Sequence, residues 1–182
     1  MLCRGDDSTL VLIDVQTRLA QAMPSACYTA MLRNIGILIQ AADKLDVPVF
    51  ATEQYPAGLG HTVDEIARAL PRGSDTFEKT CFSACSQADF ADTLAHNERP
   101  QVILAGIEAH VCVVQTAVQL REKFSVFVVE DAVCSRSEAN RANALARLRQ
   151  AGVIVTNTES VLFEWLRDAK HKHFKTLTQL IR

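Results

Sequence analysis

The sequence lacks the features of a membrane protein, a secreted protein and a nucleic-acid-binding protein. Its longest stretch without a charged residue, 19–32, has 14 residues and contains Pro24, so it is too short to cross a bilayer. The N-terminal residues include Asp6 and Asp7 and no apolar segment of the kind that forms a secretory signal. There is no basic block, and 19 basic against 21 acidic side chains give a net charge of −2, which disfavours binding to nucleic acid phosphates. We therefore expect neither nucleic acid nor a membrane as a partner.

The composition is that of a globular intracellular domain. Apolar residues make up 48% and charged residues 22% of the 182 residues, which is enough apolar material for one buried core. We find no repeat, linker or low-complexity segment and predict a single domain over 1–182. Six cysteines without a secretory signal indicate free thiols in a reducing compartment rather than a disulfide framework. We expect the cytoplasm, or another intracellular compartment such as the mitochondrion.

Short β-branched apolar runs alternate along the chain with longer segments of helical period. The runs predicted as strands are 9–13, 48–52, 76–77, 101–105, 126–129 and 153–156. Most are apolar at consecutive positions, which is the pattern of parallel strands that are covered on both faces. Between them, apolar residues recur at steps of three and four, as in Leu32, Ile35, Ile39 and Ala42. This alternation predicts an α/β fold with a doubly wound parallel sheet and helices on both faces.

One segment, 55–73, interrupts this rhythm. It contains Pro56, Gly58, Gly60 and Pro71, which predict a long loop around at most one short helix at 63–70. Loops of this length in compact domains are often functional. We therefore expect this segment to shape a binding pocket.

Three reactive side chains follow predicted strands. Asp14 ends the run Leu-Val-Leu-Ile-Asp, Lys79 follows the short strand at 76–77, and Cys112 comes shortly after the strand at 101–105, where we expect a helix to begin. In open α/β sheets, ligands bind beyond the carboxyl ends of the strands. Each residue alone has an ordinary structural explanation, but the three together at one edge indicate a reactive site.

The chemistry of Cys112 would depend on its ionisation. A thiol with a pKa of about 8.5 is only about 3% thiolate at neutral pH, and a helix N-terminus lowers the pKa of a cysteine. We therefore expect the pKa of Cys112 to be lowered. Asp14 could accept the thiol proton and later return it to a leaving amine, while Lys79 keeps the carboxylate ionised.

The motifs around these residues resemble the isochorismatase-like cysteine hydrolases. They are Leu-Ile-Asp-Val-Gln at 12–16, Thr-Glu-Gln-Tyr-Pro at 52–56, Glu-Lys-Thr-Cys-Phe-Ser at 78–83, Gly-Ile-Glu-Ala-His-Val-Cys-Val at 106–113 and Glu-Asp-Ala-Val-Cys-Ser at 130–135. The resemblance runs from about residue 8 to the C-terminus, with the motifs in the family's order. It is greater to the isochorismatase-domain-containing hydrolases than to the nicotinamidases.

The resemblance implies a fold and a set of site residues. It implies a six-stranded parallel sheet of order 3-2-1-4-5-6 and places the family's catalytic triad on Asp14, Lys79 and Cys112. It also implies a cis peptide bond between Ile107 and Glu108, with the backbone N–H groups of Glu108 and Cys112 as the oxyanion hole. From their positions alone, the candidates for the substrate pocket are Gln16, Tyr55, Phe82, Ile107 and His110.

Departures from the family pattern limit which cofactors and substrates we expect. Nicotinamidases place an Asp-x-His pair and a further histidine after the second strand to hold a metal ion, whereas this chain has no histidine there until His61. We therefore expect no catalytic metal and no other cofactor. True isochorismatases lack the nucleophilic cysteine, so Cys112 favours a small amide or a related C–N compound as the substrate over isochorismate.

Other readings of the sequence remain open. A Glu-Lys-Cys amidase of the nitrilase type is disfavoured, because such chains are longer and their β-sandwich layers do not give this series of βα units. A catalytically idle member of the fold that serves as a binding or assembly module, or as a thiol sensor, is the main alternative. We also expect a homo-oligomer, since the family usually assembles and the terminal helices are apolar.

Overall fold

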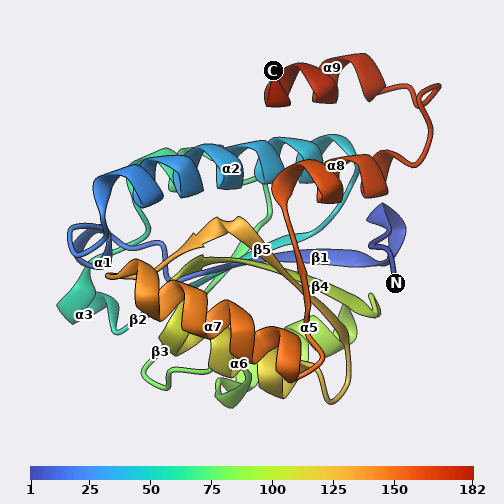
Figure 1. Cartoon of the computed structure of the whole chain (residues 1–182). Helices are drawn as coiled ribbons and strands as arrows, with labels where there is room; N and C mark the ends of the chain where they lie inside the picture. Colours follow the sequence, from blue (N-terminus) through green and yellow to red (C-terminus); the bar gives the residue numbers. More distant parts are fainter.

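The computed structural model describes residues 1–182 and is built on one six-stranded parallel sheet. The strands run in the spatial order β3-β2-β1-β4-β5-β6 (Figure 1), which confirms the predicted fold class and strand order. Their bounds are β1 (Ser8–Ile13), β2 (Val49–Gln54), β3 (Asp75–Lys79), β4 (Gln101–Ile107), β5 (Ser125–Cys134) and β6 (Ile154–Thr156). The order reverses between β1 and β4, and the crevice at such a point is where this class of sheet binds ligands.

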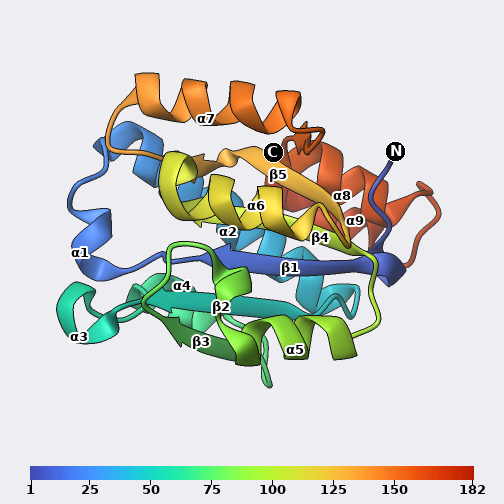
Figure 2. The same ribbon diagram turned by 90° about the horizontal axis from the view of Figure 1, so that it is seen from below.

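Helices cover both faces of the sheet (Figures 1 and 2). On one face lie α2 (Ser25–Lys44) and α8 (Thr158–Leu166), with α9 (Phe174–Thr178) beyond them, and on the other lie α5 (Ala88–His96), α6 (Val114–Leu120) and α7 (Glu138–Gln150). The remaining turns are short: η1 (Gly5–Asp7), α1 (Thr17–Ala20), α3 (Pro56–Leu59), α4 (Asp64–Ala69), η2 (Ala84–Ser86), η3 (Ala109–Val113) and η4 (Gln179–Ile181). No helix is both long enough and apolar enough to span a membrane.

The consecutive apolar residues of β1 are explained by the two cores. Leu10 and Leu12 belong to the core beneath α2 and α8, whereas Val11 and Ile13 belong to the core beneath α5, α6 and α7. Side chains of a strand alternate between the faces of a sheet, so a strand that is covered on both faces must be apolar at every position. All six residues of β1 are buried.

The two central strands approach each other closely at their carboxyl ends. Gly106 of β4 has a φ of +119°, and a Cβ atom built there would lie 2.1 Å from the carbonyl oxygen of Ile13. Only glycine fits this position, because it tolerates the positive φ and has no side chain to collide with β1. The close approach brings the residues after Ile13 and after Gly106 to one place at the sheet edge.

The segment 55–73 differs from its predicted form. It contains two short helices, α3 and α4, instead of at most one. Pro56 is the first residue of α3, where its fixed φ suits the first turn of a helix and its missing N–H costs nothing. The proline that we expected to break structure therefore begins a helical turn.

Candidate active site

Asp14 lies directly after β1, at the centre of the carboxyl edge of the sheet. Its backbone is left-handed, with a φ of +49°, and its side chain is fully buried. One carboxylate oxygen, Oδ1, accepts a hydrogen bond from the hydroxyl of Thr52 at 2.7 Å, and the other, Oδ2, accepts one from Lys79 Nζ at 2.8 Å. Both oxygens of this buried carboxylate are thus partnered, as burial of a charge requires.

Lys79 is the last residue of β3, and its ammonium group reaches past β2 to Asp14. Its side chain is also fully buried, so the two charges form an ion pair away from water. Nζ additionally donates to the side-chain oxygen of Gln54 at 2.7 Å and lies 3.2 Å from the carbonyl oxygens of Cys81 and Phe82. These polar contacts hold the lysine in one position and compensate for its lost hydration.

Cys112 lies beside this ion pair, and only 5% of its surface is exposed to solvent. Burial raises the pKa of the Cys112 thiol to about 12; the charge of Asp14 acts in the same direction, whereas Lys79 opposes them. The expectation of a lowered pKa is therefore wrong. At neutral pH, Cys112 is a neutral thiol that interacts with the Asp14 carboxylate.

The local backbone agrees with the expectation that a helix begins here. Cys112 lies within the π-helical turn Ala109–Val113, which continues directly into α6 at Val114. The position of the thiol in the first turn of a helical segment does not lower its pKa. Desolvation and a neighbouring negative charge, both of which disfavour a thiolate, decide the direction of the shift.

Glu108 precedes this turn and is tied to the loop after β5. The peptide bond between Ile107 and Glu108 is cis, as the family resemblance implied. The Glu108 carboxylate accepts hydrogen bonds from Arg136 Nε at 2.9 Å, from Arg136 Nη2 at 2.6 Å and from the Arg136 backbone N–H at 3.2 Å. Burial raises the pKa of Glu108, but the hydrogen bonds and charge of Arg136 outweigh burial and lower it.

The side chains of three pocket candidates form hydrogen bonds with, or pack against, other parts of the protein. Gln16 is fully buried, and its side chain bonds the backbone of Gln54 and the carbonyl oxygen of Gly60. Ile107 is fully buried in the apolar core. His110 is half-buried, with Nδ1 3.0 Å from Ser135 Oγ and Nε2 3.3 Å from the Asn140 amide nitrogen. These contacts hold the three side chains in place around the site, and their contact with a substrate stays a prediction.

The other two pocket candidates are accessible. Tyr55 is 57% exposed and Phe82 is 55% exposed. Tyr55 lines an open hollow that reaches Lys79, together with Pro56, Ala57, Glu78, Thr80 and Gln87. Aromatic residues that are exposed beside buried charged groups are suited to contact a substrate or a neighbouring subunit.

The acidic residue of the second strand, Glu53, is bound to the loop that follows it. Glu53 accepts hydrogen bonds from the backbone N–H of Thr62 at 2.6 Å and its hydroxyl at 2.7 Å, and lies 2.9 Å from His61 Nδ1. The carboxylate therefore anchors the loop that follows α3. Nowhere do three or more histidine, cysteine, aspartate or glutamate side chains gather as a metal site would require.

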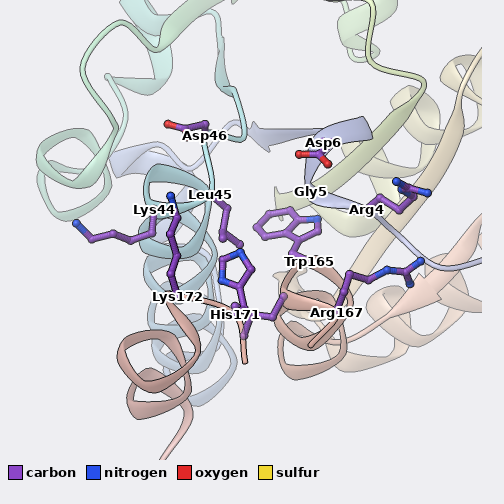
Figure 3. Close-up of a pocket in the computed structure, with 11 residues that line it drawn as sticks. Arg4, Gly5, Asp6, Lys44, Leu45, Asp46, Trp165, Arg167, His171 and Lys172 are labelled. Carbon is purple, nitrogen blue, oxygen red and sulfur yellow. The ribbon is translucent and has the colours of Figure 1, made fainter. Parts of the chain in front are cut away.

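A second hollow lies at the opposite edge of the sheet (Figure 3). It is lined by residues before β1 and by residues at and just beyond the C-terminal ends of α2 and α8, including Asp6, Lys44, Asp46, Trp165 and Arg167. Figure 3 shows the charged ends of Lys44 and Arg167 pointing to opposite sides of it. Cations near helix C-termini offset the negative ends of the helix dipoles. This hollow is remote from the carboxyl edge that holds Cys112.

Sequence reasoning missed several residues that complete the site. Thr52 binds Asp14, Gln54 binds Lys79, and Arg136 binds Glu108. Thr52 carried a usable signal, because it pairs with Ile13 in the sheet and therefore lies beside Asp14 once the strand order is known. Arg136 lies in a loop, where no strand register predicts its neighbour.

Comparisons with known proteins agree with this architecture. A family model described as the isochorismatase domain matches residues 8–160. The chain is 39% identical to isochorismatase domain-containing protein 2 of Danio rerio, over 96% of this chain and 86% of that protein. It superposes on a Caenorhabditis elegans protein described as MAR1 ribonuclease with a TM-score of 0.93 and 38% identity, covering 100% of this chain and 92% of the other.

A more distant structure has the same fold. The YcaC protein of Escherichia coli, described as an octameric hydrolase of unknown specificity, superposes with a TM-score of 0.89 and 25% identity, covering 100% of this chain and 89% of that one. The sheet order, the motifs along the chain and the family match over most of its length lead to one conclusion. The protein belongs to the isochorismatase family and has the family's hydrolase fold.

Proposed function

We propose that this protein is a metal-independent cysteine hydrolase of small amides or related C–N compounds, with Cys112, Asp14 and Lys79 as its catalytic triad. The observation that carries the proposal is the buried contact of a thiol, a carboxylate and an ammonium group at the carboxyl edge of the sheet. Substrates bind at this edge in open α/β folds. Membership of the isochorismatase family supports hydrolase chemistry.

The raised pKa of Cys112 determines how the first step proceeds. Because the resting thiol is neutral, it must lose its proton as it attacks, and the Asp14 carboxylate is the adjacent base. The sulfur bonds to the substrate carbonyl carbon, and the carbonyl electron pair moves to oxygen. Transfer of the proton from sulfur to Asp14 moves one negative charge from the carboxylate to the reacting atoms. The positive charge of Lys79 offsets this negative charge before and after the transfer. A free thiolate is never required.

The remaining steps restore the enzyme. Protonated Asp14 donates its proton to the nitrogen as the C–N bond breaks, and the amine or ammonia leaves behind a thioester on Cys112. Asp14 then accepts a proton from a water molecule that attacks the thioester carbonyl. That proton returns to sulfur as the C–S bond breaks, which releases the carboxylic acid. The backbone N–H groups of Glu108 and Cys112 would stabilise the oxyanion in both halves.

The burial of the triad favours small substrates. Asp14 is 0%, Lys79 3% and Cys112 5% exposed, so only a compact group can reach the sulfur. The net charge of −2 also disfavours a polyanion. Because the Caenorhabditis elegans relative is described as a ribonuclease, RNA is the substrate class that a test must set against amides.

Assembly would complete the pocket. Tyr55 and Phe82 leave apolar surface exposed near the triad, which a neighbouring subunit or a substrate would cover. The octameric state described for the Escherichia coli YcaC protein supports a homo-oligomer here. Light scattering on the purified protein measures this directly, and a strictly monomeric species over the micromolar range would contradict it.

The decisive experiment for the reaction compares wild type with Cys112→Ala and Cys27→Ala. Cys27 is half-buried on α2, outside the triad, and serves as the matched control. Each protein is assayed with a panel of primary amides and nitriles and with an RNA oligonucleotide. We expect amide hydrolysis that falls at least about 1,000-fold in Cys112→Ala and is unchanged in Cys27→Ala.

Two results would overturn the proposal. One is amide hydrolysis that persists in Cys112→Ala, and the other is RNA cleavage without any amide hydrolysis. Absence of Cys112-dependent turnover across the panel would favour the alternative of an idle member of the fold that acts as a binding module or thiol sensor.

A further inference from the structure

The turn that carries Cys112 is held from one side by the loop after β5. Arg136 donates two side-chain hydrogen bonds and one backbone hydrogen bond to the Glu108 carboxylate. A second tie joins His110 to Ser135, and a third joins His110 to Asn140 of α7. Two residues that precede Cys112, Glu108 and His110, are thus anchored to a neighbouring loop and helix.

The ion pair of Glu108 and Arg136 is asymmetric in its exposure. The Glu108 side chain is 5% exposed, whereas the Arg136 side chain is 58% exposed. A buried carboxylate requires a partner, and Arg136 provides a planar fork that binds both oxygens. Without the Arg136 side chain, Glu108 would keep one hydrogen bond, from the backbone N–H of residue 136. The one other titratable group that acts on Glu108 is its neighbour His110.

We infer that Arg136 is a positioning residue, which acts through Glu108 to hold the oxyanion donors and the Cys112 sulfur in their reactive geometry. The inference rests on the proposed function, since Glu108 N–H is one of the two proposed oxyanion donors. A displacement of about 1 Å in such a group can reduce a rate about 100-fold. The hydrogen bonds and the ion pair of Arg136 all go to Glu108 and not to Cys112 or Asp14, so its effect is transmitted by the Glu108 side chain.

The test uses acrylamide as a probe that reacts with thiols. Its addition to Cys112 joins sulfur to the terminal alkene carbon, while negative charge develops on the amide oxygen and a proton adds at the carbon next to the carbonyl. The rate constant for labelling of Cys112 is measured by peptide mass analysis in wild type, Arg136→Ala and Arg136→Lys. Arg149→Ala is the matched control, because Arg149 is 55% exposed and forms an ion pair with Glu130 at 2.7 Å on the far part of α7.

At neutral pH we expect Arg136→Ala to lower the labelling rate by about 10- to 100-fold. Arg136→Lys should recover part of the loss, because lysine keeps the charge but not the bidentate contact. Arg149→Ala should match wild type. A rate in Arg136→Ala within about twofold of wild type would overturn the inference.

The pH profile separates positioning from a general loss of structure. Arg136 lowers the pKa of Glu108 below its ordinary value in the wild type, against the effect of burial. In Arg136→Ala, burial acts without that opposition, and the pH at which labelling declines on acidification should rise. The double variant Glu108→Gln/Arg136→Ala should show no such rise relative to Glu108→Gln. A rise of equal size in the double variant would contradict transmission through Glu108.

A second measurement keeps this inference separate from the proposed reaction. If amide hydrolysis persists in Cys112→Ala, the proposed function fails. Amide hydrogen exchange over residues 107–113 then decides the inference alone. Faster exchange in Arg136→Ala, but not in Arg149→Ala, supports positioning by Arg136, and unchanged exchange in both refutes it.

Discussion

Replacement of Lys79 by methionine tests whether the buried ion pair is held together as the structure indicates. Lys79 Nζ lies 2.8 Å from the Asp14 carboxylate, and neither side chain is exposed to solvent. Methionine has a similar length and no charge, so Lys79→Met leaves Asp14 with the Thr52 hydroxyl and the neutral Cys112 thiol as side-chain partners and with no positive charge beside it. Removal of one partner from a buried ion pair costs about 3–5 kcal/mol, mostly because the remaining charge is uncompensated.

Urea unfolding measures this cost. For a domain whose total stability is about 5–15 kcal/mol, a loss of about 3–5 kcal/mol is a large decrease in the midpoint at an unchanged slope. Lys175→Met, which removes an exposed lysine from α9, is the control and should change stability by less than about 0.5 kcal/mol.

A double variant identifies the physical cause. Asp14→Asn removes the carboxylate charge and keeps a side chain that tolerates the left-handed backbone at this position, where φ is +49°. If the uncompensated charge causes the loss, Asp14→Asn/Lys79→Met should be more stable than Lys79→Met alone. A loss in Lys79→Met no larger than that in Lys175→Met, or a double variant less stable than Lys79→Met, would refute this reasoning.

Three further predictions concern the surroundings of the pair. Thr52→Val removes the 2.7 Å hydrogen bond to Asp14 and should lower the free energy of unfolding by about 1.5–3 kcal/mol in urea titrations; no loss would mean that the hydroxyl is not a partner. Gly106→Ala should abolish folding or cost more than about 3 kcal/mol, as measured by circular dichroism, since the new Cβ would lie 2.1 Å from the Ile13 carbonyl oxygen; a stable, folded variant would contradict the close approach of β1 and β4. Because the pKa of Cys112 is raised to about 12, its thiol stays protonated as pH rises through the neutral range, so wild type and Cys112→Ala should show the same ultraviolet thiolate absorbance between about pH 6 and 9; an extra thiolate signal in wild type would contradict the shift.

Much of the fold follows from patterns that operate along the chain. Consecutive apolar residues in β1 and β4 reflect burial on both faces, and this alternation of strands and helices leaves few arrangements open. The placement of Asp14, Lys79 and Cys112 at one edge follows from the rule for parallel sheets. The strand order itself came from the family resemblance, because hydrophobic pattern does not specify which strands are neighbours.

The ionisation of Cys112 could not be predicted from its neighbours in sequence. A local argument from a helix N-terminus favours a lowered pKa, whereas the folded chain buries the thiol and places Asp14, 98 positions earlier in the sequence, against it. Burial and charge are properties of the whole tertiary structure. The same reason explains why the hydrogen bonds of His110 and Gln16 could not be predicted, since their partners lie on other loops.

Capture of an acyl-enzyme would show whether Cys112 is the nucleophile. Wild type and Cys112→Ala are quenched during turnover of the same small amide, and the intact proteins and their peptides are weighed. We expect a covalent acyl group on the peptide that contains Cys112 in wild type, with neither adduct nor turnover in Cys112→Ala. Full turnover of that amide by Cys112→Ala would contradict this expectation.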